Sequence, residues 1–110
     1  MPKGRTVVHD PATKTTYTGF FAPEGQHTAH QNLIKAAGLQ NKPNLIGGSV
    51  KSDGSFGANS ESINRNTYGK CTAHGNATKN MRDDLQNGNY VTVSPAGNKN
   101  PGKKQFSGIQ

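Results

Sequence analysis

The first pattern of apolar and polar positions along the chain lies at residues 6–21. The run Thr6-Val7-Val8-His9 and residues 15–21 are both rich in β-branched or aromatic side chains, and Asp10-Pro11-Ala12-Thr13 between them has the composition of a turn. This pattern predicts a β-hairpin. Three further runs of the same type predict shorter strands, at residues 45–50, 67–71 and 90–93.

A first helix is predicted from Thr28 to Ala37. Thr28 is the expected N-cap, with Gln31 completing a capping box, and Gly38 supplies a glycine stop signal. Residues 41–44, with the sequence Asn-Lys-Pro-Asn, then separate this helix from the strand predicted at residues 45–50.

The second predicted helix has the more regular apolar face. Thr72 is its expected cap, and the residues that recur every four positions form one apolar stripe: Ala73, Ala77, Met81 and Leu85. The polar run Gln86-Asn87-Gly88-Asn89 ends this helix.

The two predicted helix starts resemble each other. Thr28-Ala29-His30-Gln31-Asn32 returns as Thr72-Ala73-His74-Gly75-Asn76, and Lys35 and Lys79 fall in phase with it. The match favours two related β-α-β halves, at residues 6–50 and 67–95. A match this short between common residue types also arises by chance, so the duplication is one of two interpretations.

Composition limits the fold to one small domain over residues 1–110. Only 29% of the residues are apolar and there is no Trp, so the core is thin and the loops are long. We predict an α+β fold, a small mainly antiparallel sheet with two short helices. Residues 51–66 are expected to form a loop or an irregular hairpin, and residues 95–110 a flexible basic segment.

The net charge of +7 arises from 13 Lys and Arg against 6 Asp and Glu, which favours an anionic partner such as RNA or a nucleotide. No apolar run approaches the roughly 20 residues of a membrane-spanning helix, and the N-terminus does not resemble a signal peptide. The single cysteine, Cys71, excludes an internal disulfide. We therefore expect no membrane partner, and a location in the cytoplasm or delivery into the cytoplasm of a target cell.

Helix N-termini carry unpaired N–H groups and a partial positive charge, so they bind phosphate. The expected phosphate-binding or nucleic-acid-binding residues near them are Thr28, Thr72, Lys35, Arg65, Lys70 and Tyr68. Each of these also has an ordinary role as a helix cap or a solvated side chain. Aromatic residues that can stack on bases are Tyr17, Phe20, Phe56, Tyr68 and Tyr90.

A sharper hypothesis assigns acid and base roles to histidines. Metal-independent RNA cleavage needs a base for the 2′-OH, an acid for the leaving oxygen and a cation for the phosphorane. The candidates are His27, His30 and His74 with Lys79 as the cation, and His9 is held in reserve. The sequence leaves open whether the protein is an enzyme.

No metal and no cofactor are expected. His27 and His30 have a spacing that zinc can use, and Cys71 with His74 would complete a ligand set, but no recognised second pair is present. Carboxylates are scarce, and there is neither a Walker sequence nor a dinucleotide-binding glycine motif.

The preferred function is binding of RNA or a phosphate-bearing nucleotide, with toxin-type ribonuclease activity as an extension. Size, basicity and the sheet-with-helix pattern are compatible with small ribonuclease toxin domains, a comparison that carries no residue over. One alternative is a non-catalytic nucleotide-binding or nucleic-acid-binding accessory protein of a phage or bacterium. Another is a structural or inhibitory protein that acts through a homo-oligomer or through contacts with another protein.

Overall fold

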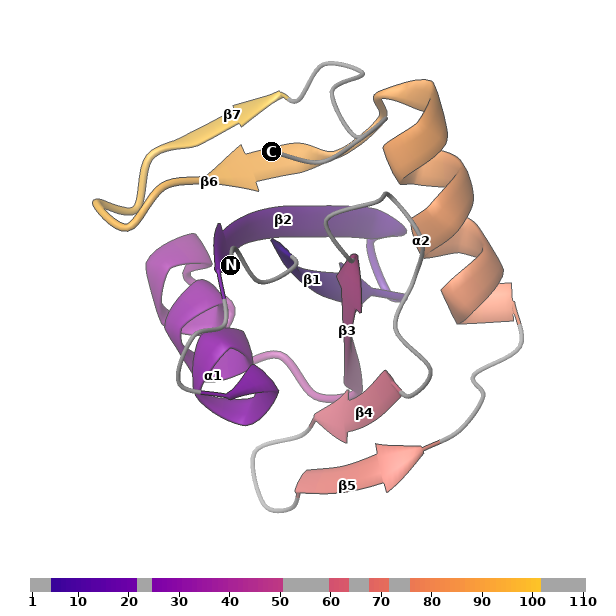
Figure 1. Ribbon diagram of the computed structural model, residues 1–110, viewed down its shortest axis with the longest axis horizontal. Helices are drawn as coiled ribbons and strands as arrows, with labels where there is room; N and C mark the ends of the chain where they lie inside the picture. Colours follow the sequence, from indigo (N-terminus) through magenta and orange to yellow (C-terminus); the bar gives the residue numbers. More distant parts are fainter. Residues whose placement is uncertain (1–4, 22–24, 51–59, 64–67, 72–75, 102–110) are drawn as a thin grey trace.

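The computed structural model describes residues 5–21, 25–50, 60–63, 68–71 and 76–101. Within these residues one sheet is covered by a helix on each face (Figure 1). The elements, in chain order, are β1 (Arg5–Asp10), β2 (Thr15–Phe21), α1 (Gln26–Ala37), β3 (Leu45–Val50), β4 (Ser60–Ile63), β5 (Tyr68–Cys71), α2 (Asn76–Asn87), β6 (Val91–Val93) and β7 (Lys99–Pro101). The predicted α+β class, with a mainly antiparallel sheet and two short helices, is confirmed.

The sheet has seven strands in the order β5-β4-β3-β1-β2-β6-β7. Every pairing is antiparallel except that of β2 with β6, which is parallel and joins Tyr17–Gly19 to Val91–Val93. Gly19 permits this pairing, because a Cβ at its position would collide with the carbonyl oxygen of Val93. The backbones of β2 and β6 therefore approach each other closely at Gly19.

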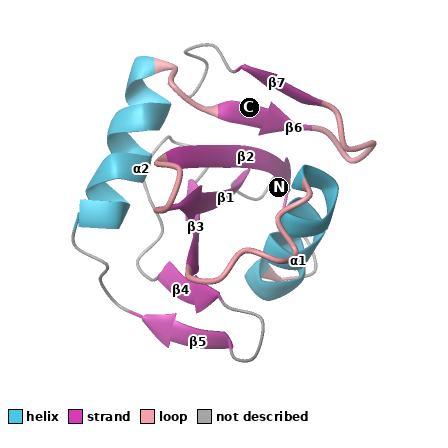
Figure 2. Cartoon of the chain, turned by 180° about the vertical axis from the view of Figure 1, so that it is seen from behind, coloured by secondary structure: helices cyan, strands magenta, loops and turns pink. Residues whose placement is uncertain are grey.

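The two helices belong to crossovers that run in opposite directions across the sheet. α1 links β2 to β3, back over β1, whereas α2 links β5 at one side to β6 at the other. Crossovers of the same hand that run in opposite directions place their helices on opposite faces of a sheet. Figure 2 shows this arrangement from behind, with α1 and α2 on either side of the central strands.

The core consists of two apolar layers, one on each face. Val7 and Val8 follow each other on β1 and therefore point to opposite faces. Val7 packs with Met81 and Leu85 of α2. Val8 packs with a larger set from α1 and the neighbouring strands, which includes Leu33, Ile34, Ala37, Leu45 and Val93. The apolar stripe predicted for the second helix is confirmed at Met81 and Leu85, which are both buried.

The start of α1 differs from the prediction, whereas its end agrees. The helix begins at Gln26 with Gly25 as its N-cap and has no side-chain cap hydrogen bond, so the prediction of a Thr28 cap with a Gln31 capping box is wrong. Thr28 lies inside the helix because the chain enters the helical conformation directly after Gly25. Gly25 has a φ of 121°, a backbone angle that glycine adopts more readily than other residues. Gly38 ends the helix in the left-handed conformation, as predicted.

The predicted hairpin and the strands at residues 45–50 and 67–71 are confirmed by β1, β2, β3 and β5. Two strands lie in segments for which no regular strand was predicted. β4 lies within the segment predicted as a loop or irregular hairpin, and β7 lies within the predicted basic tail and pairs with β6. The predicted cap Thr72 lies outside the described residues, and α2 spans Asn76–Asn87.

The two halves of the chain pair differently in the sheet. β3 pairs with β1 of its own half, whereas β6 pairs with β2 of the other half. The duplication of residues 6–50 and 67–95 stays a prediction. No helix in the described parts of the chain is long and apolar enough to cross a membrane.

Candidate functional site

His30, one of the predicted catalytic residues, lies in the interior of the protein. Only 1% of its surface is exposed, and its Nε2 lies 3.0 Å from the carbonyl oxygen of Gly48. Because a carbonyl oxygen only accepts, Nε2 carries the proton and donates it. The imidazole ring packs against Gly47, where a Cβ would lie 2.6 Å from Cε1. His30 thus joins α1 to β3, and its catalytic role stays a prediction.

The other predicted residues on the helices lie on the surface. His27, Thr28 and Lys35 are exposed on α1, and Lys79 is exposed on α2. Nζ of Lys79 lies 2.7 Å from Oδ2 of Asp83, an ion pair one helical turn along the same helix. α1 and α2 lie on opposite faces of the sheet, so these residues do not form one site.

The side chains of the remaining predicted residues lie outside the described part of the chain. His74, Thr72 and Arg65 lie outside the described residues, and the side chains of Lys70 and Tyr68 on β5 also lie outside them. The pairing of His30 with His74 therefore stays a prediction.

A groove that these predictions did not include lies where β2 and β6 begin. It has a volume of about 530 Å³ and is lined by two short segments and one residue of β7: Lys14, Thr15, Thr16, Tyr17, Gly88, Asn89, Tyr90, Val91 and Lys99. The two strands pair only from Tyr17 and Val91 onward. The groove therefore opens where they have not yet come together. Its volume is typical of small-ligand sites, which span roughly 300 to 1,000 Å³.

Two tyrosines line the groove, and they belong to opposite faces of the sheet. Tyr17 packs against the apolar layer under α1 and remains half-buried, whereas Tyr90 belongs to the layer under α2 and is buried. Burial raises the pKa of the Tyr17 phenol, and the negative charge of Asp10 raises it further. At neutral pH the Tyr17 hydroxyl is therefore neutral and able to donate a hydrogen bond.

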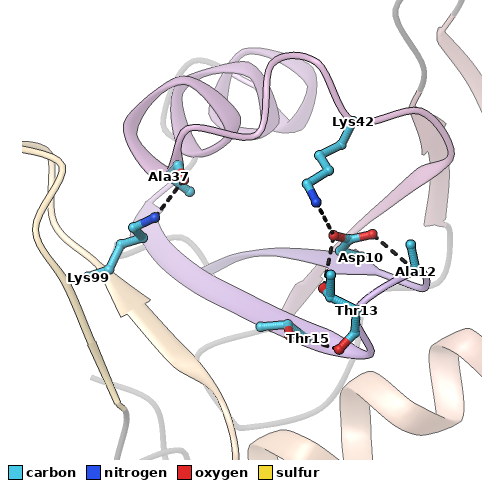
Figure 3. Close-up of polar contacts among 7 residues, drawn as sticks. All are labelled: Asp10, Ala12, Thr13, Thr15, Ala37, Lys42 and Lys99. Carbon is cyan, nitrogen blue, oxygen red and sulfur yellow. Dashed lines mark hydrogen bonds and ion pairs between the residues drawn. The ribbon is translucent and has the colours of Figure 1, made fainter.

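Two lysines give the groove a positive charge. Lys99 is held in place, since its Nζ donates to the carbonyl oxygen of Ala37 at 3.1 Å (Figure 3). This contact places a cation at the C-terminus of α1, where the helix dipole favours it. Lys14 is exposed at the end of the β1–β2 turn and, among the described residues, has no hydrogen-bond or ion-pair partner. Lys14 is therefore available to an anionic ligand.

The turn that carries Lys14 is fixed by the buried carboxylate of Asp10 (Figure 3). Oδ1 of Asp10 accepts from the backbone N–H of Ala12 at 3.1 Å, and Oδ2 accepts from the hydroxyl of Thr13 at 2.9 Å. Nζ of Lys42 lies 3.6 Å from the same Oδ2 and balances its charge. Asp10 thereby orders the turn whose last residue, Lys14, adopts a φ of 55°.

A buried hydrogen-bond network lies beneath the groove. The hydroxyl of Thr16 donates to Oδ2 of Asp84 at 2.7 Å. Nδ1 of His9 lies 2.9 Å from Oγ1 of Thr16, and because the Thr16 proton is already donated to Asp84, Nδ1 of His9 is the donor in this contact. Burial lowers the pKa of His9, and the carboxylates of Asp84 and Asp10 oppose that change in part. Neutral His9 with its proton on Nδ1 thus matches the network, which connects α2 to the wall of the groove.

The groove combines aromatic surface, two cations and the side-chain amide of Asn89. Such a set suits a flat ligand with a negative charge, because aromatic faces bind planar rings and ammonium groups bind phosphate. Nothing in the described chain brings together three or more His, Cys, Asp or Glu side chains as a metal site.

Tyr17 and Tyr90 were among the aromatic residues named from the sequence, but Lys14, Asn89 and Lys99 were missed. The turn composition before Lys14 and the Gly-Asn pair at the end of α2 were visible signals of loops. Neither signal indicates that β2 and β6 are neighbours, which is what makes these residues one site.

The comparisons with known proteins give no relative from which a role can be transferred. No protein-family model, curated protein or solved structure matches the chain.

Proposed function

We propose that the protein binds RNA or a phosphate-bearing nucleotide in the groove between the starts of β2 and β6. The observation that carries the proposal is the groove itself, in which Lys14 and Lys99 lie beside Tyr17. The net charge of +7 adds a long-range attraction for polyanions, which concentrates such ligands at the surface.

The electrostatics of the groove favour the phosphate on the side of Lys14. Gly88 follows the C-terminus of α2, where the unpaired carbonyl groups carry a partial negative charge. A phosphate is disfavoured there, whereas the ammonium group of Lys14 attracts it.

Binding is proposed in preference to cleavage. None of the histidines that the structure describes is among the residues lining the groove. His9 is the nearest by hydrogen bonding, yet Thr16 lies between it and the groove, and its exposed fraction is only 2%.

The test is a titration of the 110-residue chain with fluorescently labelled RNA at low salt. Lys14→Ala should weaken the affinity by about fivefold, equivalent to about 1 kcal/mol, and should flatten its dependence on salt. Lys35→Ala is the matched control, because Lys35 is an exposed lysine on α1 that does not line the groove. Equal losses in both variants, or no affinity for RNA, DNA or nucleotides at low salt, would remove the proposal.

A further inference from the structure

The groove forms a recess in the protein surface. One wall is formed by residues 14–17, at the start of β2. The other wall is formed by residues 88–91, which lead into β6. A recess receives a group that projects from its ligand. In an RNA duplex the bases are stacked and paired inside the helix, whereas an unpaired nucleotide can turn its base outward. The shape therefore favours an unpaired nucleotide.

The inner surface of the groove suits the face of a base. Tyr17 and Val91 are register partners in the β2–β6 pairing, and both are half-buried. Together they present an aromatic ring beside an aliphatic side chain. Base–aromatic stacking is independent of sequence, because every base has a flat π-face.

The edge of the groove offers groups that suit the edge of a base and its phosphate. Asn89 is exposed, and its side-chain amide has both a donor and an acceptor, as the edges of bases do. Its backbone N–H donates to the carbonyl oxygen of Asp84 at 2.8 Å, which fixes its main chain at the end of α2. On the other strand, the turn ordered by Asp10 holds the cation of Lys14.

We infer that the groove takes one unpaired nucleotide, with its base against Tyr17 and Val91, its base edge at Asn89 and its phosphate at Lys14. This inference rests on the proposed function and names the ligand more closely. An unpaired nucleotide occurs within single-stranded RNA or as a free nucleoside monophosphate, and both present the same base and phosphate.

The experiment compares four probes on the 110-residue chain at one salt concentration. They are a labelled single-stranded RNA, the same strand annealed to its complement, adenosine monophosphate as a competitor, and inorganic phosphate as a competitor. The single strand should bind about tenfold more tightly than the duplex, in line with one stacked base. Adenosine monophosphate should compete at concentrations at which inorganic phosphate does not.

Two substitutions of Tyr17 test the position of the base. Tyr17→Leu should weaken binding of the single strand by about tenfold and leave duplex binding unchanged, because it keeps an apolar side chain but removes the aromatic face. Tyr17→Phe should retain the affinity of the native protein. Since Tyr17 packs on the core, Asn89→Ala serves as a second variant on an exposed residue, and it should reduce the discrimination among the four nucleoside monophosphates.

The outcomes separate this inference from the proposed function. Equal affinity for single strand and duplex, both dependent on Lys14, would overturn the inference and leave the proposed function standing. A folded Tyr17→Leu variant with native affinity for the single strand would also overturn it. Absence of binding to every probe would overturn both. Binding of adenosine monophosphate in a direct titration, without binding of the oligonucleotide, would support the inference with a free nucleotide as the ligand.

Discussion

The imidazole ring of His30 occupies the space that a side chain at Gly47 would need. A Cβ on Gly47 would lie 2.6 Å from Cε1 of His30 and 2.7 Å from each ring nitrogen. The neighbouring Gly48 accepts the hydrogen bond from Nε2 of His30, and a Cβ on Gly48 would face α2, 3.6 Å from Cε of Met81. The two glycines thus bring a side chain from each helix close to the backbone of β3.

Gly47→Ala should therefore destabilise the protein, by about 1 to 3 kcal/mol, because the ring of His30 has to move within a packed interior. Chemical denaturation measures the free energy of unfolding. Gly48→Ala is the matched control and should cost less, since its new methyl group would be in ordinary contact with Met81. If both variants lose the same stability, the close packing of His30 on Gly47 is not the cause.

Asp84→Ala should be far more costly than Asp83→Ala, although the two residues are adjacent on α2. Asp84 accepts a hydrogen bond from the hydroxyl of Thr16, a residue that is only 1% exposed. Removal of the Asp84 carboxylate leaves this buried donor without its acceptor, at a cost of about 1 to 3 kcal/mol. Asp83 pairs with the exposed Lys79, and such surface pairs contribute about 0 to 1 kcal/mol.

Thermal or chemical unfolding of both variants checks this prediction, and Thr16→Val supplies the second arm. With Thr16→Val already present, Asp84→Ala should cost less than it does in the native protein, because the buried hydroxyl is gone. An unchanged cost of Asp84→Ala would show that its effect does not pass through Thr16.

The pKa of His9 predicts a loss of stability on acidification. Burial lowers this pKa in the folded protein, so the unfolded chain binds the proton first as the pH falls through the ordinary histidine value of about 6.5. The contribution of neutral His9 is complete above that value, declines below it and levels off once the pH is below the folded pKa.

The free energy of unfolding at about pH 7.5 and at about pH 5 measures this decline. His9→Asn retains a donor for Thr16 but does not titrate, so its stability should fall less over this interval than that of the native protein. Asn32→Ala, a substitution of an exposed and non-titrating residue of α1, is the control, and its decline should match that of the native protein. The opposite ranking of the two variants would contradict the assignment to His9.

Local sequence signals were sufficient for most of the fold. The hairpin, the strand at residues 45–50, the glycine end of α1 and the apolar face of α2 all follow from features a few residues apart. The failures have physical reasons as well. The start of α1 depends on Gly25 and not on a capping side chain. β7 lies in a segment rich in proline, glycine and lysine, and its strand conformation depends on pairing with β6.

The groove was beyond prediction because it depends on contacts between residues far apart in the chain. Tyr17 and Val91 are brought together only by the parallel pairing of β2 with β6, after α2 has crossed the sheet. The histidines near the predicted helix starts indicated a different site, and one of them, His30, has a ring that packs against Gly47. A residue type suited to catalysis gives no information about its burial.

The most direct test of ligand binding in the groove is to locate the ligand on the isotopically labelled 110-residue chain by amide chemical-shift changes during titration with single-stranded RNA. The largest changes should lie at Thr15 to Tyr17 and at Gly88 to Val91, and Lys14→Ala should reduce them. Changes gathered instead around His27, Thr28 and Lys35 on α1, with the groove undisturbed, would contradict binding in the groove.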